Sequence, residues 1–244
     1  MICGVAGFEA GRRGSMLLLV LGRGRTGSLV ADVARDRGHS VRVIGEEENK
    51  NASALTAPML AQFDAVVDFT TPEAVIFNLR ACLSNGARVV VGTTGWYEKL
   101  DEMRAICKRR NAGLVYGANF SIGVQIVYRL AAELARLAQG FKIEVSETHH
   151  AGKKDAPSGT ALVLKNVLET ANPALHVEVT SHRTGDSIGT HTITARSEHE
   201  RIEIEHEAFS RRSFAEGAVR AAEWLAGRTG CYDFSEIYPQ LAKG

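Results

Sequence analysis

The first half of this chain alternates short apolar runs with amphipathic segments, and this alternation restricts the fold more than any other feature. Five runs are predicted to be strands: MLLLVLG (16–22), HSVRVIG (39–45), FDAVVDFTT (63–71), ARVVVGTTG (87–95) and AGLVYGANF (112–120). The first run has no polar side chain, as a strand buried on both faces requires. Helical spacing of apolar residues is found between the runs, at 28–38, 73–86 and 99–111. Strands that alternate with helices predict a doubly wound α/β fold with a parallel sheet.

The sequence changes in character after Phe120. The predicted elements are helices over 122–140, 160–172 and 213–227, and strands over 141–150, 176–183, 189–197 and 201–209. The last three strands alternate in polarity, which predicts antiparallel pairing with one face in water. A short tail is expected to follow the last helix. These elements predict a second domain of the α+β class.

We therefore expect three regions in the chain. Residues 1–15 are expected to be a disordered extension. Residues 16–118 together with 212–244 are expected to form the doubly wound domain. Residues 119–211 are expected to form the α+β domain, with hinges near Asn119 and Ser210.

The composition limits the kinds of partner. Hydrophobic residues make up 45% of the chain, and 29 basic against 28 acidic side chains leave a net charge of +1. This balance argues against a nucleic-acid-binding surface, and no apolar run approaches the roughly 20 residues of a membrane span. The four cysteines form no metal-binding pattern, which suits a reducing cytoplasm. We expect a cytoplasmic protein that binds a small molecule, without a metal, nucleic acid or membrane partner.

The segment GRGRTG (22–27) follows the first predicted strand and opens the first predicted helix. Glycines there allow a pyrophosphate to approach a helix N-terminus closely, as in Rossmann-like dinucleotide-binding domains. Glu46 follows the second strand at about the expected distance of 20 residues and could accept hydrogen bonds from an adenosine ribose, although Glu47 could replace it. The predicted dinucleotide site contains Gly22, Gly24, Arg25, Thr26, Gly27 and Glu46.

Two further predicted strands end in small polar residues, GTTG (92–95) and GANF (117–120). An open parallel sheet presents the carboxyl ends of its strands to a ligand, so both segments are expected to line one site. The alternative is that both are ordinary turns.

The segment ETHHAGKKDAPSGTAL (147–162) places imidazoles, an ammonium group and a helix start close together. The free N–H groups and hydroxyls of SGT (158–160) offer a carboxylate site at the helix start. Lys153 adds positive charge, and one imidazole of His149 or His150 can act as a general acid near neutral pH. This combination favours a site that binds a carboxylate and protonates a group beside it. The alternative is a capped helix with solvated lysines and histidines.

The same segment, written E-x-HH-x-x-K-x-DAPSGTA, resembles the signature of the dihydrodipicolinate reductase family, also called 4-hydroxy-tetrahydrodipicolinate reductases. Further segments resemble that family in the same order: DFTTPEA (68–74), GTTGW (92–96), ANFSIGV (118–124), GDSIGTH (185–191) and FAEGAVRAAEWL (214–225). The resemblance covers the chain from Met16. It implies an enzyme that reduces a cyclic imine dicarboxylate in the lysine and diaminopimelate pathway, with hydride from NADH or NADPH.

The resemblance also implies roles for individual residues. His149 matches the acid–base histidine and Lys153 the proton-donating lysine of the family. Substrate contacts match at His150, Gly159 and Thr160, to which the helix-start argument adds Lys153 and Ser158. Contacts around the nicotinamide match at Gly92, Thr93, Thr94, Gly117, Ala118, Asn119 and Phe120. The resemblance further implies a homotetramer built through the second domain.

Three departures from the family pattern bear on these expectations. The loop LGRGRTG is one residue shorter than, or shifted from, the usual G-x-x-G-R-M-G. The stretch between His182 and His191 is shorter than in many members, which makes a dimer the alternative to the tetramer. The connection from Glu48 to Phe63 is also short, which could trim the adenosine end of the cofactor site.

The three consecutive glutamates at 46–48 predict a modest preference for NADH, because carboxylates repel the 2′-phosphate of NADPH and no arginine stands beside them in the sequence. Two other functions remain open from the residues. One is another two-domain NAD(P)-dependent dehydrogenase, and the other is a nucleotide-sensing relative without catalytic activity.

Overall fold

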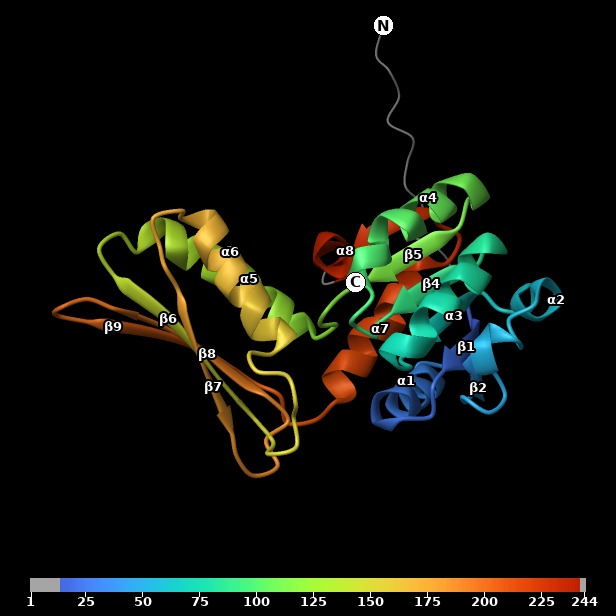
Figure 1. Cartoon of the computed structure of the whole chain (residues 1–244), viewed down its shortest axis with the longest axis horizontal. Coiled ribbons are helices and arrows are strands. Elements are labelled where there is room, and N and C mark those ends of the chain that lie inside the picture. The colour runs from blue at the N-terminus through green and yellow to red at the C-terminus, as the bar shows by residue number, and fades with distance from the viewer. Residues whose placement is uncertain (1–13, 242–244) are drawn as a thin grey trace, which may run out of the picture.

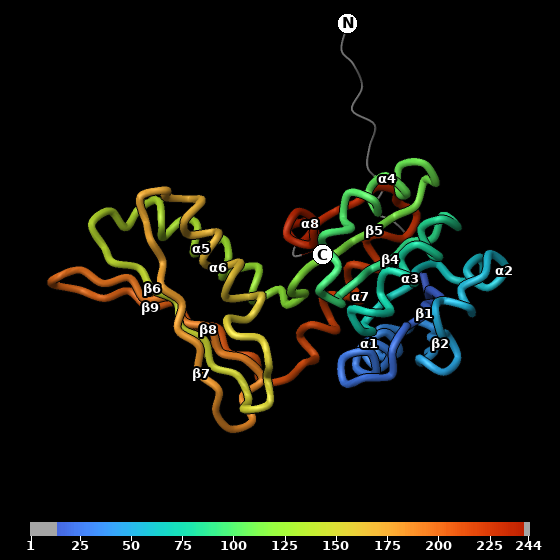
Figure 2. The backbone as a smooth tube through the Cα atoms, in the orientation of Figure 1, coloured from blue at the N-terminus to red at the C-terminus, as the bar shows by residue number. Residues whose placement is uncertain are grey.

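The computed structural model describes residues 14–241 and contains two lobes, each built around one sheet (Figure 1). The backbone crosses between the lobes twice, after β5 (Gly113–Tyr116) and before α7 (Arg212–Leu225), as Figure 2 shows. All but two residues of the expected extension 1–15 lie outside the described part of the chain. Among the described helices, none has the length and apolar character to span a membrane.

The first lobe holds a six-stranded, entirely parallel sheet in the order β10-β5-β4-β3-β1-β2. Its strands are β1 (Leu17–Leu21), β2 (Ser40–Ile44), β3 (Ala65–Asp68), β4 (Arg88–Val91), β5 and β10 (Gly230–Asp233). Each of the five apolar runs contains one of the first five strands. The predicted Rossmann-like parallel sheet is therefore confirmed.

Side chains on successive residues of β1 point into two apolar layers on opposite faces of the sheet. Leu18 and Val20 belong to the layer that includes α1 and α7, whereas Leu19 and Leu21 belong to the layer that includes α3 and α4. This double burial explains why the run at 16–22 carries no polar side chain. The first layer is covered by α1 (Arg25–Asp36), α7 and α8 (Phe234–Leu241). The second is covered by α2 (Ala57–Leu60), α3 (Pro72–Ser84) and α4 (Leu100–Arg110).

The expected short tail is wrong, because the chain after α7 forms strand β10 and helix α8. Strand β10 pairs in parallel with β5, with Cys231 opposite Leu114. A four-residue strand, GCYD, is too short to distinguish from a turn by its pattern of polarity. The short connection before Phe63 is also structured, since it holds a 3₁₀ turn, η1 (Lys50–Ala52), and α2.

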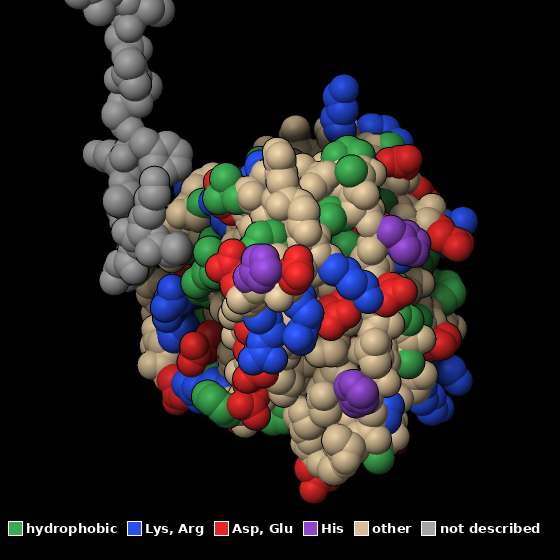
Figure 3. All heavy atoms as spheres, turned by 90° about the vertical axis from the view of Figure 1, so that its left-hand side faces the viewer, with side chains coloured by type: hydrophobic (Ala, Val, Ile, Leu, Met, Phe, Trp, Pro, Cys, Tyr) green, Lys and Arg blue, Asp and Glu red, His purple; other side chains and the backbone are tan. Residues whose placement is uncertain are grey.

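The second lobe holds a four-stranded sheet in the order β7-β6-β8-β9, covered on one face by α5 (Ile122–Leu137) and α6 (Gly159–Ala171). Its strands are β6 (Lys142–His149), β7 (Glu178–Arg183), β8 (Thr190–Arg196) and β9 (Arg201–Glu207). Val145 and Ile193 face the helices and are buried. Ser146 and Thr192 lie opposite one another on the other face, where Figure 3 shows hydrophobic side chains only in scattered positions.

The predicted antiparallel pairing of β7 is wrong. Strand β7 runs parallel to β6, with Glu144 opposite Glu178. Strands β8 and β9 are antiparallel as predicted, and β6 also pairs antiparallel with β8. Helix α6 returns the chain along one face of the sheet, so β6, α6 and β7 form a crossover unit. A period-two pattern indicates which face of a strand is buried but not the direction in which the strand runs.

The two crossings between the lobes touch one another. Gly217 of α7 lies so close to the carbonyl oxygen of Phe120 that an added methyl group would overlap it. Alanines and larger apolar residues of α7 are fully buried on the sheet, including Ala218, Val219 and Leu225. The second crossing therefore ends inside the core of the first lobe.

Candidate active site

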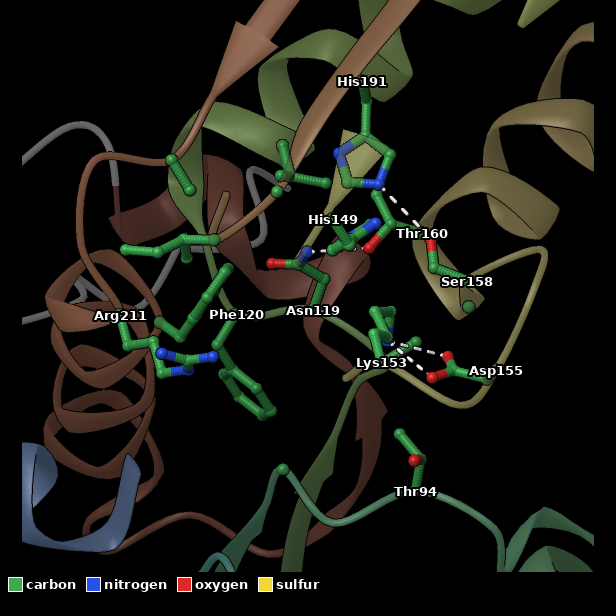
Figure 4. Close-up of a pocket in the computed structure, with 18 of the residues that line it drawn as sticks. Thr94, Asn119, Phe120, His149, Lys153, Asp155, Ser158, Thr160, His191 and Arg211 are labelled. Atoms are coloured by element: carbon green, nitrogen blue, oxygen red, sulfur yellow. Dashed lines mark hydrogen bonds and ion pairs between the residues drawn. The ribbon is translucent and has the colours of Figure 1, made fainter. Parts of the chain in front are cut away.

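A cavity of about 530 Å³ lies between the two lobes and is lined by both (Figure 4). The first lobe contributes Thr26, Phe69, Gly92, Thr94 and Ala118, and Arg211 lies at the crossing before α7. The second contributes His149, His150, Lys153, Ser158, Gly159, Thr160, His191 and His206. A neighbouring cavity of about 400 Å³ extends over Gly24, Arg25 and Thr70 and shares Thr26, Gly92 and Arg211 with the first. The glycine-rich loop and the predicted carboxylate site thus face one cleft.

The glycine-rich loop has the close backbone approaches that glycine permits. Gly22 has φ +102°, and a side chain there would collide with the Phe69 carbonyl oxygen. A side chain at Gly27 would collide with the carbonyl oxygen of Gly22. Helix α1 begins directly after Gly24 without a side-chain cap, and within residues 14–241 the N–H groups of 25–27 have no acceptor. These groups fit a pyrophosphate, which a helix N-terminus stabilises.

The residues after β2 differ from the predicted arrangement. Glu46 is exposed, and its carbonyl oxygen accepts from the Asn49 N–H at 3.1 Å, whereas the Glu48 side chain accepts a hydrogen bond from the Gly45 N–H at 2.9 Å. Glu48 also forms an ion pair of 2.6 Å with Arg23 from the glycine-rich loop. No arginine adjoins the glutamates in the sequence, but the expectation that none offsets their charge is wrong. The fold brings together residues that lie 25 positions apart in the sequence, which a linear pattern does not show.

The GTTG segment after β4 divides into a buried and an exposed threonine. The Thr93 hydroxyl donates to Asp68 at 3.0 Å and accepts from the Thr70 N–H at 2.8 Å. Asp68 is fully buried and also accepts from Asn78 at 2.8 Å; burial raises the pKa of this carboxyl group, while these hydrogen bonds lower it. Thr93 therefore supports the loop from below. Thr94 is exposed and reaches the cavity.

Several residues that were predicted to contact the nicotinamide pack against aromatic side chains. A side chain at Gly92 would overlap the ring of Phe69, and one at Gly117 would press on Phe234. Phe120 is buried and packs against both rings, with centroid distances of 6.3 Å to Phe69 and 4.5 Å to Phe234. These glycines are therefore needed to seat the rings. Ala118 is the exposed member of the 117–120 segment.

Asn119 joins the two lobes at the hinge. Its side-chain amide donates to the Thr160 hydroxyl at 2.9 Å, and its side-chain oxygen accepts from the Ser121 N–H at 2.8 Å. Its carbonyl oxygen accepts from Gln125 at 2.9 Å. Asn119 thus ties the end of the parallel sheet to the first turn of α6.

The start of α6 has the properties of an anion site. Ser158 caps the helix by accepting from the Ala161 N–H at 3.3 Å. The Ser158 N–H donates a hydrogen bond to the Glu147 carboxylate at 3.0 Å. Within the described chain the N–H groups of Gly159 and Thr160 have no acceptor, and both residues line the cavity. A carboxylate can accept from these two groups at the positive end of the helix.

Lys153 faces the cavity but is already paired. Its ammonium lies 2.7 and 2.8 Å from the two carboxylate oxygens of Asp155 (Figure 4). The Lys153 N–H donates to the carbonyl oxygen of His150, which is half-buried. An incoming carboxylate must compete with Asp155 for the ammonium.

His149 lies at the end of β6, with its side chain 9% exposed. Its Nδ1 is 3.5 Å from Glu147, and its ring meets the ring of His191 edge-on at 5.1 Å between centroids. Burial lowers the pKa of His149, Glu147 raises it, and the cations of Lys153 and Arg183 lower it, so that it lies below the ordinary value. A partly buried imidazole with a lowered pKa gives up a proton readily.

Four residues of the site were not identified from the sequence. Glu147 and His191 lie in segments that resemble the family, but the resemblance assigns them no role, and Arg183 lies in a predicted strand without a further signal. Arg211 begins the return into the first lobe and lines both cavities, with its pKa lowered by burial and by Arg25. A glutamate two residues before a candidate acid, in the same alternating strand, is the one sequence signal for this network.

The ligand atoms of Glu147, His149 and His191 lie within 4.8 Å of one another, the spacing at which three such groups could hold a metal ion. Arg183 lies 2.8 Å from the carboxylate and already balances its charge. A dication would then leave an uncompensated buried charge, which is costly. The cluster is better suited to a proton than to a metal ion.

A doubly wound sheet with a bare helix N-terminus, joined by a cleft to an α+β lobe that carries a candidate acid and a candidate anion site, defines a two-domain nucleotide-dependent oxidoreductase. Family models described as dihydrodipicolinate reductase, N-terminus and C-terminus, match residues 1–120 and 123–238. The chain belongs to the dihydrodipicolinate reductase family.

Individual relatives agree with this placement. The chain is 32% identical to 4-hydroxy-tetrahydrodipicolinate reductase of Christiangramia forsetii, over 93% of this chain and 100% of the relative. It is 38% identical to the enzyme of that name from Myxococcus xanthus, over 93% and 94%. A solved dipicolinate-bound dihydrodipicolinate reductase from Paenisporosarcina sp. TG-14 shares the fold, with a TM-score of 0.76, 21% identity and coverage of 92% and 100%. These matches favour the family over another two-domain dehydrogenase.

Proposed function

We propose that this protein reduces 4-hydroxy-tetrahydrodipicolinate to tetrahydrodipicolinate with NADH or NADPH, a step of lysine and diaminopimelate biosynthesis. The observation that carries the proposal is the meeting of two sites in one cavity. The glycine-rich loop and the strand ends line it from one side, and His149, Lys153 and the start of α6 line it from the other. Membership of the family supports the same reaction.

The substrate is a dicarboxylate, and the second lobe offers two groups that suit a carboxylate. One carboxylate would accept from the N–H groups of Gly159 and Thr160 and lie within reach of the Lys153 ammonium. His150 and Ser158 would complete this part of the site. Binding to these groups would hold the ring in the cleft, facing the first lobe.

The cofactor fits the first lobe, because the loop at 22–27 leaves room for a pyrophosphate at the start of α1. Its nicotinamide would supply the hydride and lie near Gly92, Thr94 and Ala118. His149 or Lys153 supplies the proton that the reduced ring takes up. Closure of the two lobes about Asn119 would exclude water from the cleft.

We further propose that both cofactors are used, with a modest preference for NADH. The carboxylates of Glu46 and Glu48 would accept hydrogen bonds from ribose hydroxyls and repel a 2′-phosphate. Arg23 offsets part of this repulsion, since its guanidinium already lies against Glu48. A preference of a few-fold, rather than exclusion of NADPH, is the expected result.

The remaining proposals concern boundaries and assembly. We propose a dinucleotide-binding domain of residues 16–118 and 212–244, and a substrate-binding and oligomerisation domain of residues 119–211. The Ser and Thr face of the second sheet and the 86% exposed Phe209 support a homotetramer, or a dimer, built through this domain. We propose a cytoplasmic location, which the free thiols of the three described cysteines support.

An assay that follows the loss of NADH absorbance with enzymatically generated substrate tests the function. Turnover is expected with the full system, and omission of either substrate or cofactor is expected to abolish it. A purified, folded protein that binds NADH but shows no turnover with this substrate would contradict the proposal. That result would favour the nucleotide-sensing alternative.

A further inference from the structure

The carboxylate of Glu147 is buried under the floor of the cleft and its two oxygens have different surroundings. Oε1 accepts three hydrogen bonds, from the Ser158 N–H at 3.0 Å, the Ser181 hydroxyl at 2.8 Å and the Arg183 guanidinium at 2.8 Å. Burial alone would raise the pKa of Glu147, but these hydrogen bonds lower it to about 2. The group therefore stays charged at all working pH values.

The second oxygen, Oε2, faces two imidazoles. It lies 3.5 Å from Nδ1 of His149 and 3.6 Å from Nε2 of His191. Both Glu147 Oε2 and His149 Nδ1 are buried without a hydrogen-bond partner. A polar atom that is buried without a hydrogen-bond partner destabilises the folded protein. A small movement would bring these two atoms into a hydrogen bond.

The opposite nitrogen of His149 faces the cleft. A methyl group added at Gly189 would stand 2.9 Å from His149 Nε2, so the absence of a side chain there leaves Nε2 open. Gly189 lines the cavity together with His149. The ring therefore has one nitrogen directed to a fixed carboxylate and the other directed to the substrate space.

We propose that Glu147 is a positioning residue that holds the Nδ1 proton of His149, so that Nε2 is the nitrogen that exchanges a proton with the substrate. The proposal rests on the proposed function. His191 is assigned a supporting part: its Nε2 lies 3.3 Å from the Ser158 hydroxyl and links the cap of α6 to the same carboxylate. The acid and the anion site are then held by one buried group.

The charge around His149 decides how this arrangement responds to pH. The charged or titratable groups that face it are Glu147 on β6, Lys153 and Asp155 on the following loop, Arg183 on β7 and His191 on β8, with His206 on β9 beside His191. Glu147 is the largest of these influences that raises the pKa of His149. Removal of its charge is expected to lower that pKa further and to shorten the pH range in which His149 is protonated.

The substitution Glu147→Gln tests the proposal with little change of shape. The three donors at Oε1 need an acceptor, so the amide oxygen must occupy that position and the NH₂ group must face His149. Nδ1 then has to accept, which moves the proton of the neutral ring to Nε2. The expected result is a fall in kcat on the order of 10- to 100-fold with a smaller change in KM, and a high-pH limb of the kcat profile that moves to lower pH.

The tautomer can be read independently of activity. Histidine ¹⁵N NMR of the substrate-free protein, with the His149 signal assigned by its loss in His149→Asn, is expected to show the Nδ1–H form in the wild type. Glu147→Gln should show the Nε2–H form, and Glu147→Asp should return towards the wild type. Glu144→Gln, on the same strand but half exposed, is the matched control and should change neither kinetics nor tautomer.

The double variant Glu147→Gln/Arg183→Met removes the buried ion pair as a unit and replaces Glu147→Gln if that single variant does not fold. A folded Glu147 variant with unchanged kcat, pH profile and tautomer would overturn the proposal. One equivalent of bound metal in the purified protein, or loss of activity with EDTA, would also overturn it. Absence of turnover in the wild type would count against the proposed function alone, because the NMR result still decides the role of Glu147.

Discussion

The ion pair between Lys153 and Asp155 should weaken substrate binding, and the substitution Asp155→Asn should strengthen it. In the substrate-free protein the ammonium is held at 2.7 and 2.8 Å by the carboxylate, and a substrate carboxylate must displace it. Replacement by asparagine removes the competing charge without removing the side chain. The expected effect is a lower KM for the substrate with little change in the KM for NADH.

The size of the effect follows from exposure. The side chains of Lys153 and Asp155 are 23% and 58% exposed, so solvent screens the pair. Exposed pairs of this kind contribute about 0.2–1 kcal/mol, which corresponds to a KM lower by about 1.5- to 5-fold. At about 1 M salt, where the Debye length is only about 3 Å, the difference between variant and wild type should largely disappear.

The assay is steady-state kinetics of wild type and Asp155→Asn at low and high salt, at saturating NADH. Glu198→Gln, an exposed acid in the turn between β8 and β9 and in the same lobe, is the control and should leave KM unchanged. A folded Asp155→Asn protein whose KM is unchanged or raised at low salt would refute the reasoning. Asp155 would then hold Lys153 in its productive position instead of competing for it.

Three further outcomes are expected. His149→Gln should lower kcat by about 10²-fold or more, and Lys153→Ala should both lower kcat and raise KM. Steady-state kinetics measures both effects, and near-normal values for either variant would contradict the role assigned to that residue. Arg23→Ala should lower kcat/KM for NADPH more than for NADH, and Glu46→Ala should shift the ratio towards NADPH; an unmoved ratio in both would show that neither meets the ribose. Burial lowers the pKa of His191 to about 4, so the unfolded chain binds more protons below about pH 6.5 and stability should fall between about pH 6.5 and 4. Melting temperatures of wild type and His191→Asn across that range check this, since the variant should lose less stability on acidification.

The sequence predicts best where one local pattern decides the outcome. The parallel sheet can be predicted from apolar runs such as MLLLVLG, because a strand buried on both faces needs an apolar side chain at every position. The candidate anion site at the start of α6 is equally local, since it consists of three consecutive residues. Direction and partner are not local properties. The parallel course of β7, the pairing of β10 and the Arg23–Glu48 contact each depend on a segment distant in the chain.

The residues of the candidate site also fall into those that the sequence identifies and those that it does not. His149 and Lys153 stand out by residue type, and the structure places both at the cavity. The partners that set the charge of these two residues do not stand out: Asp155 could equally be a solvated turn residue. The alternation of β6 places Glu147 on the buried face but does not show that Arg183 and the two imidazoles meet it there. Thr93 is the converse case, because its sequence position suggests a ligand contact while its hydroxyl is used by Asp68.

The return of the chain into the first lobe has a consequence for folding during synthesis. The layer over β1 and β3 is completed by α7 and α8, whose residues follow the whole second lobe in the sequence. As the chain leaves the ribosome, strands β1 to β5 emerge with that apolar layer covered only by α1. Pairings across such long sequence separations form slowly, and the exposed surface is prone to aggregation in the meantime. Nascent chains stopped before Arg212 should therefore bind chaperones and be cleaved readily by proteases, whereas the second lobe, whose elements are contiguous, can fold before synthesis ends.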